Sequence, residues 1–143
     1  MVGCSGYVGT KVRYGVLTVK TRNNGRWTEA RFRSFIVSAL RQAHAKWGVK
    51  HDVKSAARVA RGVYKCAKCG KGSPATLPPL EGKKRRRNNA AVDHIDPVVD
   101  PAVGFIDWNT YIERMFIEAE GYQVLCHKCH TAKTNAERKR RKK

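Results

Sequence analysis

Two Cys-x-x-Cys pairs, Cys66-Ala-Lys-Cys69 and Cys126-His-Lys-Cys129, constrain the fold of this chain more than any other feature. Each pair can form a tight turn that presents two thiolates to one ion, and two pairs complete the tetrahedral Cys4 site of structural zinc. Because four protein ligands leave no open coordination position, zinc here is expected to stabilise the fold and not to react. The alternative is four unligated buried thiols. A zinc site would join two parts of the chain that a long segment separates.

The positive charge of the chain is the second strong signal. Its 143 residues suffice for one domain with a modest core, and a hydrophobic fraction of 41% argues against wholesale disorder. There are 30 Lys and Arg residues against 11 Asp and Glu residues, a formal net charge of +19. Such an excess destabilises a compact state unless a polyanion or bound ions offset it. Nucleic acid is therefore the leading partner, and an anionic membrane surface is the weaker one.

The sequence contains no signal for secretion or membrane insertion. No apolar run approaches the roughly 18–20 residues of a membrane span, and the N-terminus lacks the apolar core of a signal peptide. Val2 occupies the position at which N-myristoylation requires Gly. We therefore expect a protein of the reducing cytoplasm without membrane contact, where cysteines bind metal instead of forming disulfides. Cys4 lies outside both pairs and is expected to be a plain thiol.

Residues 1–26 are predicted to form a basic, weakly ordered arm or hairpin, with a turn at the Asn-Asn-Gly sequence of residues 23–25. A helix is predicted to follow, with Thr28 as its N-cap and Trp27 packed on Phe32. Cations lie off its apolar stripe and would form either a solvated face or a contact to the DNA backbone: Arg31, Arg33, Arg41 and Lys46.

A second short helix is predicted from Asp52 as cap to a stop near Gly62, so that residues 27–63 form a helical region. His44 and His51 have no other ligand types at suitable spacing and are taken as ordinary surface or packing residues. The segment after the first cysteine pair, SPATLPPLEGKKRRRNN, is too rich in Pro, Gly and charge to be regular throughout. It contains five consecutive cations that are expected to contact DNA: Lys83, Lys84, Arg85, Arg86 and Arg87.

The second half of the chain alternates strands and helices. AAVDHIDP predicts a short strand that ends before Pro97, and YQVLC predicts another. Between them, aromatic and aliphatic residues at helical spacing predict a helix with Asp107 as cap and Gly121 as stop. From His130 to the end the composition favours a helix. The fold class expected from these elements is α+β.

Asp93, His94 and His130 are the metal-binding and acid–base residue types left after the cysteines are assigned. A carboxylate and an imidazole from different elements could hold a divalent cation with water positions open, and a second imidazole could act as general base. Adjacent strand residues such as Asp93 and His94 face opposite ways, so a bend at the strand end would be needed to bring both to one site. The plain alternative for the Asp-His pair is a surface pair at a turn.

Two segments, VDHIDP and QVLCHKCHTAKTNAE, resemble in register the signature of HNH endonucleases of the ββα-metal superfamily, as found in phage-type members. The resemblance covers about residues 64–138. It implies a small ββα-metal nuclease core held together by the zinc site, preceded by the N-terminal helical region and followed by a basic tail at residues 139–143. It also implies a divalent-metal-dependent DNA endonuclease that nicks or cuts both strands, in the host cytoplasm if the protein is encoded by a phage.

Carried over by position, the resemblance implies that Asp93 and His130 bind one Mg²⁺ or Mn²⁺ ion and that His94 accepts a proton from the attacking water. Lys133 would contact DNA phosphate, with a plain helix-surface lysine as the alternative. His127 matches no functional position. The usual signature has an Asn five residues before the second cysteine pair, where this chain has Gly121, so Asn109 is the nearest candidate for that Asn.

The distribution of charge supports a metal-dependent site that also binds a polyphosphate chain. Residues 88–120 are acidic, and basic runs lie on both sides, at residues 83–87 and 138–143. Two other functions remain open: a catalytically silent, zinc-dependent nucleic-acid-binding module, and an accessory protein that acts through protein contacts. No dimerisation motif is visible, and we expect a monomer or a weak dimer.

Overall fold

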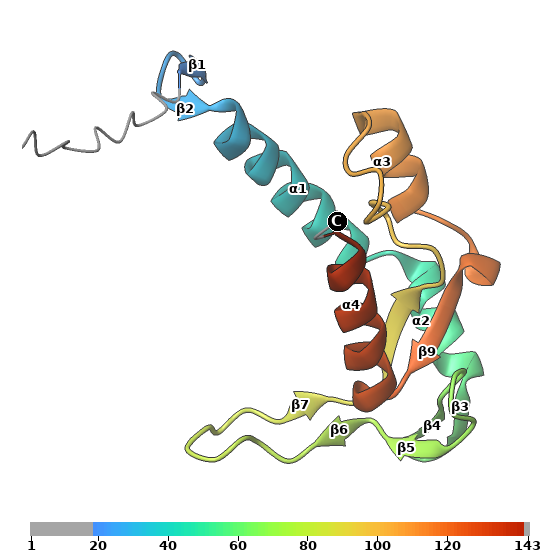
Figure 1. Ribbon diagram of the computed structural model, residues 1–143. Helices are drawn as coiled ribbons and strands as arrows, with labels where there is room; N and C mark the ends of the chain where they lie inside the picture. Colours follow the sequence, from blue (N-terminus) through green and yellow to red (C-terminus); the bar gives the residue numbers. More distant parts are fainter. Residues whose placement is uncertain (1–18, 142–143) are drawn as a thin grey trace, which may run out of the picture. The chain divides into compact units, whose positions relative to one another are not determined.

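The computed structural model describes residues 19–141 (Figure 1). Most of the predicted arm, including Cys4, and the last two residues of the basic tail therefore lie outside the described residues. The chain divides into two compact units, residues 1–39 and residues 40–143. In the described residues the secondary structure is a mixture of helices and small antiparallel sheets, as the α+β prediction requires.

A short hairpin opens the described part of the first unit. Strand β1 (Lys20–Arg22) pairs antiparallel with β2 (Trp27–Thr28). The turn between them uses the predicted Asn-Asn-Gly sequence, in which all three residues have positive φ, between 50° and 72°. Asn and Gly tolerate this left-handed conformation better than other residues.

Helix α1 (Glu29–Ala45) begins where the hairpin ends. The hydroxyl of Thr28 accepts a hydrogen bond from the Arg31 backbone N–H at 3.2 Å, which confirms Thr28 as the N-cap. The Trp27 ring packs on Phe35, at 5.1 Å between ring centroids, one turn beyond the predicted partner Phe32. The Phe32 ring instead receives the Arg22 guanidinium, 4.7 Å from its centroid.

The predicted second helix is wrong at both ends. Helix α2 spans Gly48–Ala56, so Asp52 lies in its middle, and residues 58–60 form strand β3 (Arg58–Ala60). This strand pairs with β4 (Val63–Lys65) through a turn in which Gly62 has a φ of 71°. The alanine-rich sequence favours a helix locally, but pairing with β4 overrides that preference.

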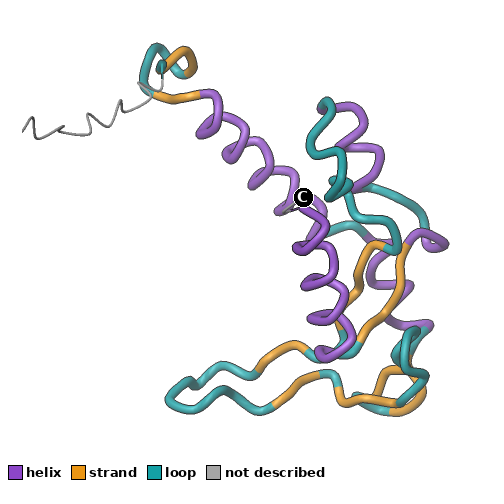
Figure 2. The backbone as a smooth tube through the Cα atoms, in the orientation of Figure 1, coloured by secondary structure: helices purple, strands orange, loops and turns teal. Residues whose placement is uncertain are grey.

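The segment from residue 72 to residue 90 is more regular than predicted. Strand β5 (Gly72–Pro74) pairs with β4, and β6 (Thr76–Leu77) pairs with β7 (Arg87–Asn88). The β6–β7 pair is the base of a long hairpin whose irregular end contains residues 83–86 of the run of cations, while Arg87 lies in β7 (Figure 2).

Strands β8 (Ala91–His94) and β9 (Tyr122–Leu125) confirm the two strands predicted in the second half of the chain. They pair antiparallel with Asp93 opposite Gln123 and His94 opposite Tyr122. Helix α4 (His127–Arg141) follows β9 directly and begins three residues earlier than predicted. An antiparallel strand pair followed by a helix is thus the framework around Asp93, His94 and His130.

Helix α3 (Trp108–Met115) lies between β8 and β9 in the sequence and is shorter than predicted. Its cap is the predicted one, because the Asp107 carboxylate accepts the Thr110 N–H at 2.8 Å. The helix ends at Met115, and the chain reaches Gly121 through a loop and a turn of 3₁₀ helix (Ala119–Gly121). The loop from Met115 to Ile117 lies against the site described below.

The buried core is small and centred on the β8–β9 pair. The most buried of its large side chains are those of Leu125 and Cys66, each 1% exposed. The remaining apolar members come from β9, from α3 and from the residue before β8: Ala90, Tyr111, Met115, Tyr122 and Val124. A metal ion bound by residues around a core this small would increase the stability of the fold.

Candidate functional site

The four predicted zinc ligands lie together. The sulfur atoms of Cys66, Cys69, Cys126 and Cys129 are all within 4.8 Å of one another, and they are the one group of three or more potential metal ligands found among residues 19–141. Four thiolates bound tetrahedrally at about 2.3 Å from zinc would be separated by slightly less than 4 Å. The cysteine cluster could therefore hold a metal ion such as zinc.

The backbone around the first pair explains why its turn forms. Gly70 adopts a φ of 69° and its N–H donates to the Cys66 carbonyl at 2.9 Å, closing the turn. The Ala67 N–H donates to the Val124 carbonyl at 2.8 Å, which fixes this turn to strand β9. Both pairs are thus fixed by the backbone close to the same strand.

The thiols differ in acidity. Burial of Cys66 opposes its ionisation, but backbone N–H groups around its sulfur lower the pKa of the thiol to about 6. Hydrogen bonding to the Cys126 side chain and burial raise the pKa of Cys129 to about 12. One sulfur thus ionises readily while its neighbour resists a second negative charge. A cation among the four sulfurs would remove that repulsion.

Asn89 is a structural residue at this site that the sequence analysis missed. It is 6% exposed, and its side-chain amide donates to the Pro74 carbonyl at 2.8 Å. Its side-chain oxygen accepts the backbone N–H of His127, the first residue of α4, at 2.9 Å. Asn89 therefore caps the helix that carries Cys129 and begins directly after Cys126. The Asn-Asn pair at the end of a basic run gave no periodic signal for this role.

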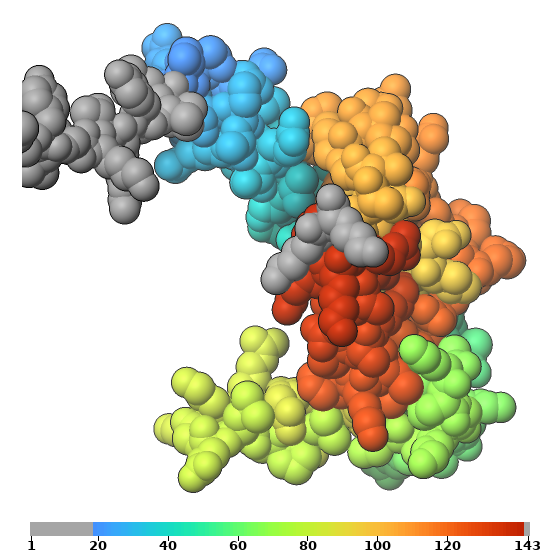
Figure 3. Space-filling view, viewed as in Figure 1, coloured from blue at the N-terminus to red at the C-terminus, as the bar shows by residue number. Residues whose placement is uncertain are grey.

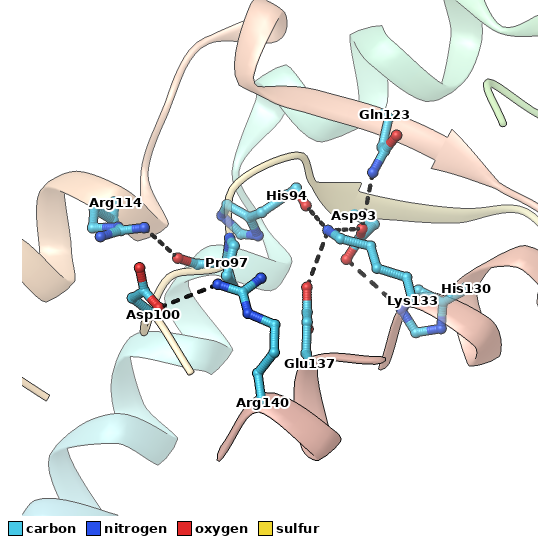
Figure 4. Close-up of polar contacts among 10 residues, drawn as sticks. All are labelled: Asp93, His94, Pro97, Asp100, Arg114, Gln123, His130, Lys133, Glu137 and Arg140. Atoms are coloured by element: carbon cyan, nitrogen blue, oxygen red, sulfur yellow. Dashed lines mark hydrogen bonds and ion pairs between the residues drawn. The ribbon is translucent and has the colours of Figure 1, made fainter. Parts of the chain in front are cut away.

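Asp93 and His130 are brought close together by β8 and the first turns of α4 (Figure 4). Asp93 Oδ1 lies 3.8 Å from His130 Nε2. The other carboxylate oxygen, Oδ2, accepts hydrogen bonds from Gln123 Nε2 at 3.3 Å and from Lys133 Nζ at 2.5 Å. The carboxylate is thus fixed on one oxygen and faces His130 with the other.

Lys133 lies in the site and not on the outer surface. Besides Asp93, its ammonium group contacts the His94 carbonyl and lies 3.5 Å from Glu137 Oε1. These three contacts account for the three donor protons of the ammonium group. Lys133 thus binds protein groups in this structure, and its contact with DNA phosphate stays a prediction. The role for Lys133 was drawn from its place on the helix, and its carboxylate partner could not be read from that.

His94 faces the opposite side of the strand pair. Its Nε2 lies 2.9 Å from the Met115 carbonyl, and its ring packs on Tyr122 at 4.8 Å and on His44 at 5.2 Å. Figure 4 shows the His94 ring directed away from Asp93 while the His94 carbonyl faces Lys133. The alternation of strand side chains therefore persists to the end of β8, and the expected bend does not bring the two side chains onto one face.

A cavity of about 350 Å³ opens beside His94. Its wall includes Glu137 of α4, which contacts Lys133, and two arginines, Arg41 and Arg141. The cavity therefore connects the His94 face of the site with the helix that carries His130 and Lys133.

His44 is a second residue whose role the sequence analysis missed, since it was taken as a surface or packing residue. Its Nε2 lies 2.8 Å from the Tyr122 hydroxyl, and its ring also meets Phe116 edge-on. Burial, together with the positive charges of Lys50 and His94, lowers the pKa of His44 to about 4. His44 is therefore neutral near pH 7. An isolated histidine gives no sequence signal for such a contact.

The remaining predicted residues have mixed outcomes. Asn109 is an exposed residue in the first turn of α3, and the structure does not bring it to Asp93 or His94. His127 contributes a backbone N–H to the Asn89 contact and is half-buried. Of the basic run, Arg86 and Arg87 donate within the hairpin, to Thr76 and to the Pro78 carbonyl.

The other three cations of the run, Lys83, Lys84 and Arg85, have exposed side chains. The end of the β6–β7 hairpin extends away from α4 in the space-filling view (Figure 3). These cations are therefore accessible to a partner.

Comparison of the chain with family models, with curated proteins and with solved structures found no match. Within residues 19–141, no helix has the length and apolar character that crossing a membrane requires. The function must therefore be argued from the site itself.

Proposed function

We propose that the protein is a divalent-metal-dependent DNA endonuclease that hydrolyses phosphodiester bonds. The observation that carries the proposal is the approach of Asp93 Oδ1 to His130 Nε2, at 3.8 Å. Asp93 and His130 come from β8 and α4, and their meeting is what the resemblance of the sequence to HNH endonucleases implies. On this proposal, β8, β9 and α4 form a ββα-metal core held together by zinc.

Asp93 and His130 fit a divalent cation. Two ligands of one Mg²⁺ or Mn²⁺ ion, each about 2.0–2.2 Å from it, lie roughly 3–4 Å apart. The Asp93–His130 distance falls within that range. Two protein ligands would leave several positions for water and phosphate oxygens. Such an ion supplies Lewis-acid stabilisation of the negative charge that develops on the phosphate and on the departing 3′ oxygen.

Gln123 and Lys133 position Asp93 in this proposal. Both donate to Oδ2, so they orient the carboxylate and leave Oδ1 facing His130. Ligating carboxylates in metal sites are usually hydrogen-bonded in this way. In this proposal Lys133 therefore acts on the ligand Asp93.

His94 is the proposed general base. A carbonyl oxygen can only accept, so the contact between Nε2 and the Met115 carbonyl requires the proton of neutral His94 to be on Nε2. Nδ1 is then the nitrogen with a lone pair, which suits it to accept a proton from the water that attacks phosphorus. The His94 ring and the Asp93 carboxylate lie on opposite faces of β8, so on this proposal the bound phosphate would have to reach both around the end of the strand, where the cavity beside His94 extends to Glu137 of α4.

DNA is the proposed partner because of the charge of the chain. The exposed cations of the β6–β7 hairpin would bind phosphates without regard to sequence. One copy of the chain is enough to nick one strand, whereas cutting both strands would favour a dimer.

The test is incubation of supercoiled plasmid with zinc-loaded protein in Mg²⁺, in Mn²⁺ or in EDTA. Metal-dependent relaxation or linearisation that stops in EDTA is expected, and it should be lost in Asp93→Asn and His130→Ala. His127→Ala is the matched control, because it changes a histidine of the same helix that is not one of the proposed ligands. Zinc content is measured after each incubation, since EDTA must not remove the structural ion. No cleavage by folded, zinc-loaded wild type under any condition would refute the proposal.

A catalytically silent nucleic-acid-binding module is the second candidate. The observation that favours it is the ion pair between Lys133 and Asp93, which neutralises the carboxylate that a metal would use. A silent module would bind DNA with the same dependence on salt but would bind no Mn²⁺. Calorimetric titration of Mn²⁺ into wild type and Asp93→Asn separates the two: heat of binding seen only in wild type supports the nuclease.

A further inference from the structure

Four groups form a connected network behind His94. The Met115 carbonyl accepts hydrogen bonds from two sides, from His94 Nε2 at 2.9 Å and from the Tyr122 hydroxyl at 3.0 Å. The Tyr122 oxygen in turn lies 2.8 Å from His44 Nε2. Tyr122 is 5% exposed, so its hydroxyl depends on these partners and not on water.

The count of protons fixes the direction of each bond. Tyr122 has one hydroxyl proton and gives it to Met115, so the contact with His44 must be donated by His44 Nε2–H. His94 likewise donates its Nε2–H. Both lone pairs of the carbonyl are then used. If His94 carried its proton on Nδ1 instead, two acceptors would face each other and the hydrogen bond would be lost.

The rings add a steric restraint. The His94 ring lies between Tyr122, at 4.8 Å, and His44, whose ring is nearly parallel to it at 5.2 Å and 26°. A ring packed on two sides has few alternative orientations. The hydrogen bond and the packing therefore favour the same placement of Nδ1.

The loop that provides the carbonyl is itself fixed from the segment between α1 and α2. Trp47 Nε1 donates to the Ile117 carbonyl at 2.9 Å, and the Trp47 ring meets Phe116 edge-on at 5.5 Å. His44 also meets Phe116 edge-on, at 5.6 Å. The residues from His44 to Trp47 thus hold the loop that orients His94.

Gly121 explains why this chain needs that support. A Cβ at this position would lie 2.3 Å from Ile117 Cδ1, so no larger residue fits unless Ile117 moves. Gly121 therefore has no side chain that could fix the loop, and Ile117 packs against its backbone. Tyr122, the next residue, holds the loop through the Met115 carbonyl instead.

We propose that Tyr122 and His44 are positioning residues that hold His94 in one tautomer and orientation, with Nδ1 available to accept a proton. The inference rests on the proposed function for its catalytic consequence, but the tautomer itself can be measured without any reaction. It also gives the end of α1 a part in the site, which the sequence signature of the core does not contain.

The test uses full-length, zinc-loaded protein with ¹⁵N-labelled histidine and no Mg²⁺ or Mn²⁺. Long-range ¹H–¹⁵N spectra report the tautomer of each histidine. Wild-type His94 is expected to be protonated on Nε2. Tyr122→Phe removes only the hydroxyl, and it should give His94 a mixture of tautomers while zinc content and circular dichroism stay unchanged.

Two replacements of His44 separate donation from packing. His44→Phe keeps a ring but removes the donor, whereas His44→Gln keeps an N–H donor on a side chain of similar reach. We expect kcat for plasmid cleavage to fall about tenfold or more in Tyr122→Phe and His44→Phe, with KM for DNA unchanged and with partial recovery in His44→Gln. His51→Phe, in the neighbouring helix, is the matched control and should behave as wild type.

The outcomes distinguish this inference from the proposed function. A wild type that cleaves, together with Tyr122→Phe and His44→Phe variants that keep both kcat and the His94 tautomer, overturns the inference alone. A wild type that does not cleave overturns the proposed function, and the spectra then decide on the positioning of His94. A loss of kcat equal in His44→Phe and His44→Gln, with an unchanged tautomer, would show a packing role and also overturn the inference.

Discussion

At the scale of single residues, His44 shows how packing sets protonation. Burial, with the charges of Lys50 and His94, lowers its pKa to about 4 from the usual 6.5. The unfolded chain therefore binds a proton at His44 as the pH falls below about 6.5, while the folded chain does not until about pH 4. The free energy of unfolding should thus decrease over that interval on account of His44 and be unaffected by it above pH 7.

The prediction is checked by urea unfolding of zinc-loaded protein at several pH values between 4 and 8. His44→Gln cannot take up the proton, so its curve of unfolding free energy against pH should be flatter than that of wild type. His51→Gln provides the control for loss of a histidine. Parallel wild-type and His44→Gln curves would contradict a neutral, buried His44.

Asn89 offers a second prediction at this scale. Asn89→Ala removes two part-buried hydrogen bonds, to the Pro74 carbonyl and from the His127 N–H, and each such bond contributes about 0.5–1.5 kcal/mol. The variant should be destabilised by about 1–3 kcal/mol in urea unfolding. Asn135→Ala, at an exposed position of α4, should change stability by less than about 0.5 kcal/mol. Similar effects of the two substitutions would show that Asn89 is not a structural cap.

At the scale of elements, the cysteine cluster joins three of them: the turn after β4, the end of β9 and the start of α4. Removal of zinc should therefore loosen all three together. We expect Cys66→Ser to lose zinc and to lower the midpoint of thermal unfolding by many degrees, because Cys66 lies in the core at 1% exposure. The measurements are zinc content and circular dichroism on heating. An unchanged midpoint in zinc-free protein would mean that the thiols are packed without a structural ion.

The elements also show what the sequence could predict. Strands β8 and β9 were predictable because short apolar runs ended at Pro97 and at the second cysteine pair. The cap of α3 was predictable because Asp107 precedes a helical pattern. Strand β3 could not be predicted, because its pairing with β4 depends on contacts across the turn at Gly62 that local composition does not reveal.

The site divides in the same way. The cysteines could be predicted to lie together because their spacing is typical of a zinc site, and the proximity of Asp93 to His130 is what the resemblance to HNH endonucleases implies. The neighbours of Asp93 and His94 could not be predicted: Gln123 reaches Asp93 only through the β8–β9 register, and His44 reaches His94 only through tertiary packing. Lys133 was placed on the correct helix, but its contacts with Asp93 and Glu137 could not be read from the sequence.

At the scale of the whole molecule, a formal charge of +19 makes binding to a polyanion the main expectation. Replacing Lys83, Lys84 and Arg85 by Ala removes three exposed cations from the β6–β7 hairpin. The slope of log K against log salt for duplex DNA should become shallower by about 2–3, because each lost phosphate contact releases roughly 0.9 fewer counterions. The variant should lose the same factor of affinity for two DNA duplexes of unrelated sequence. An unchanged slope would place the DNA contact elsewhere on the protein.

On the proposed function, His94 removes a proton from water during metal-dependent cleavage of DNA. This role is tested by the initial rate of plasmid cleavage in Mn²⁺ by wild type and His94→Ala at equal zinc content. We expect cleavage by wild type and a loss of at least about 100-fold in His94→Ala, with unchanged DNA affinity. Equal rates for the two proteins, or no cleavage by either, would contradict this role.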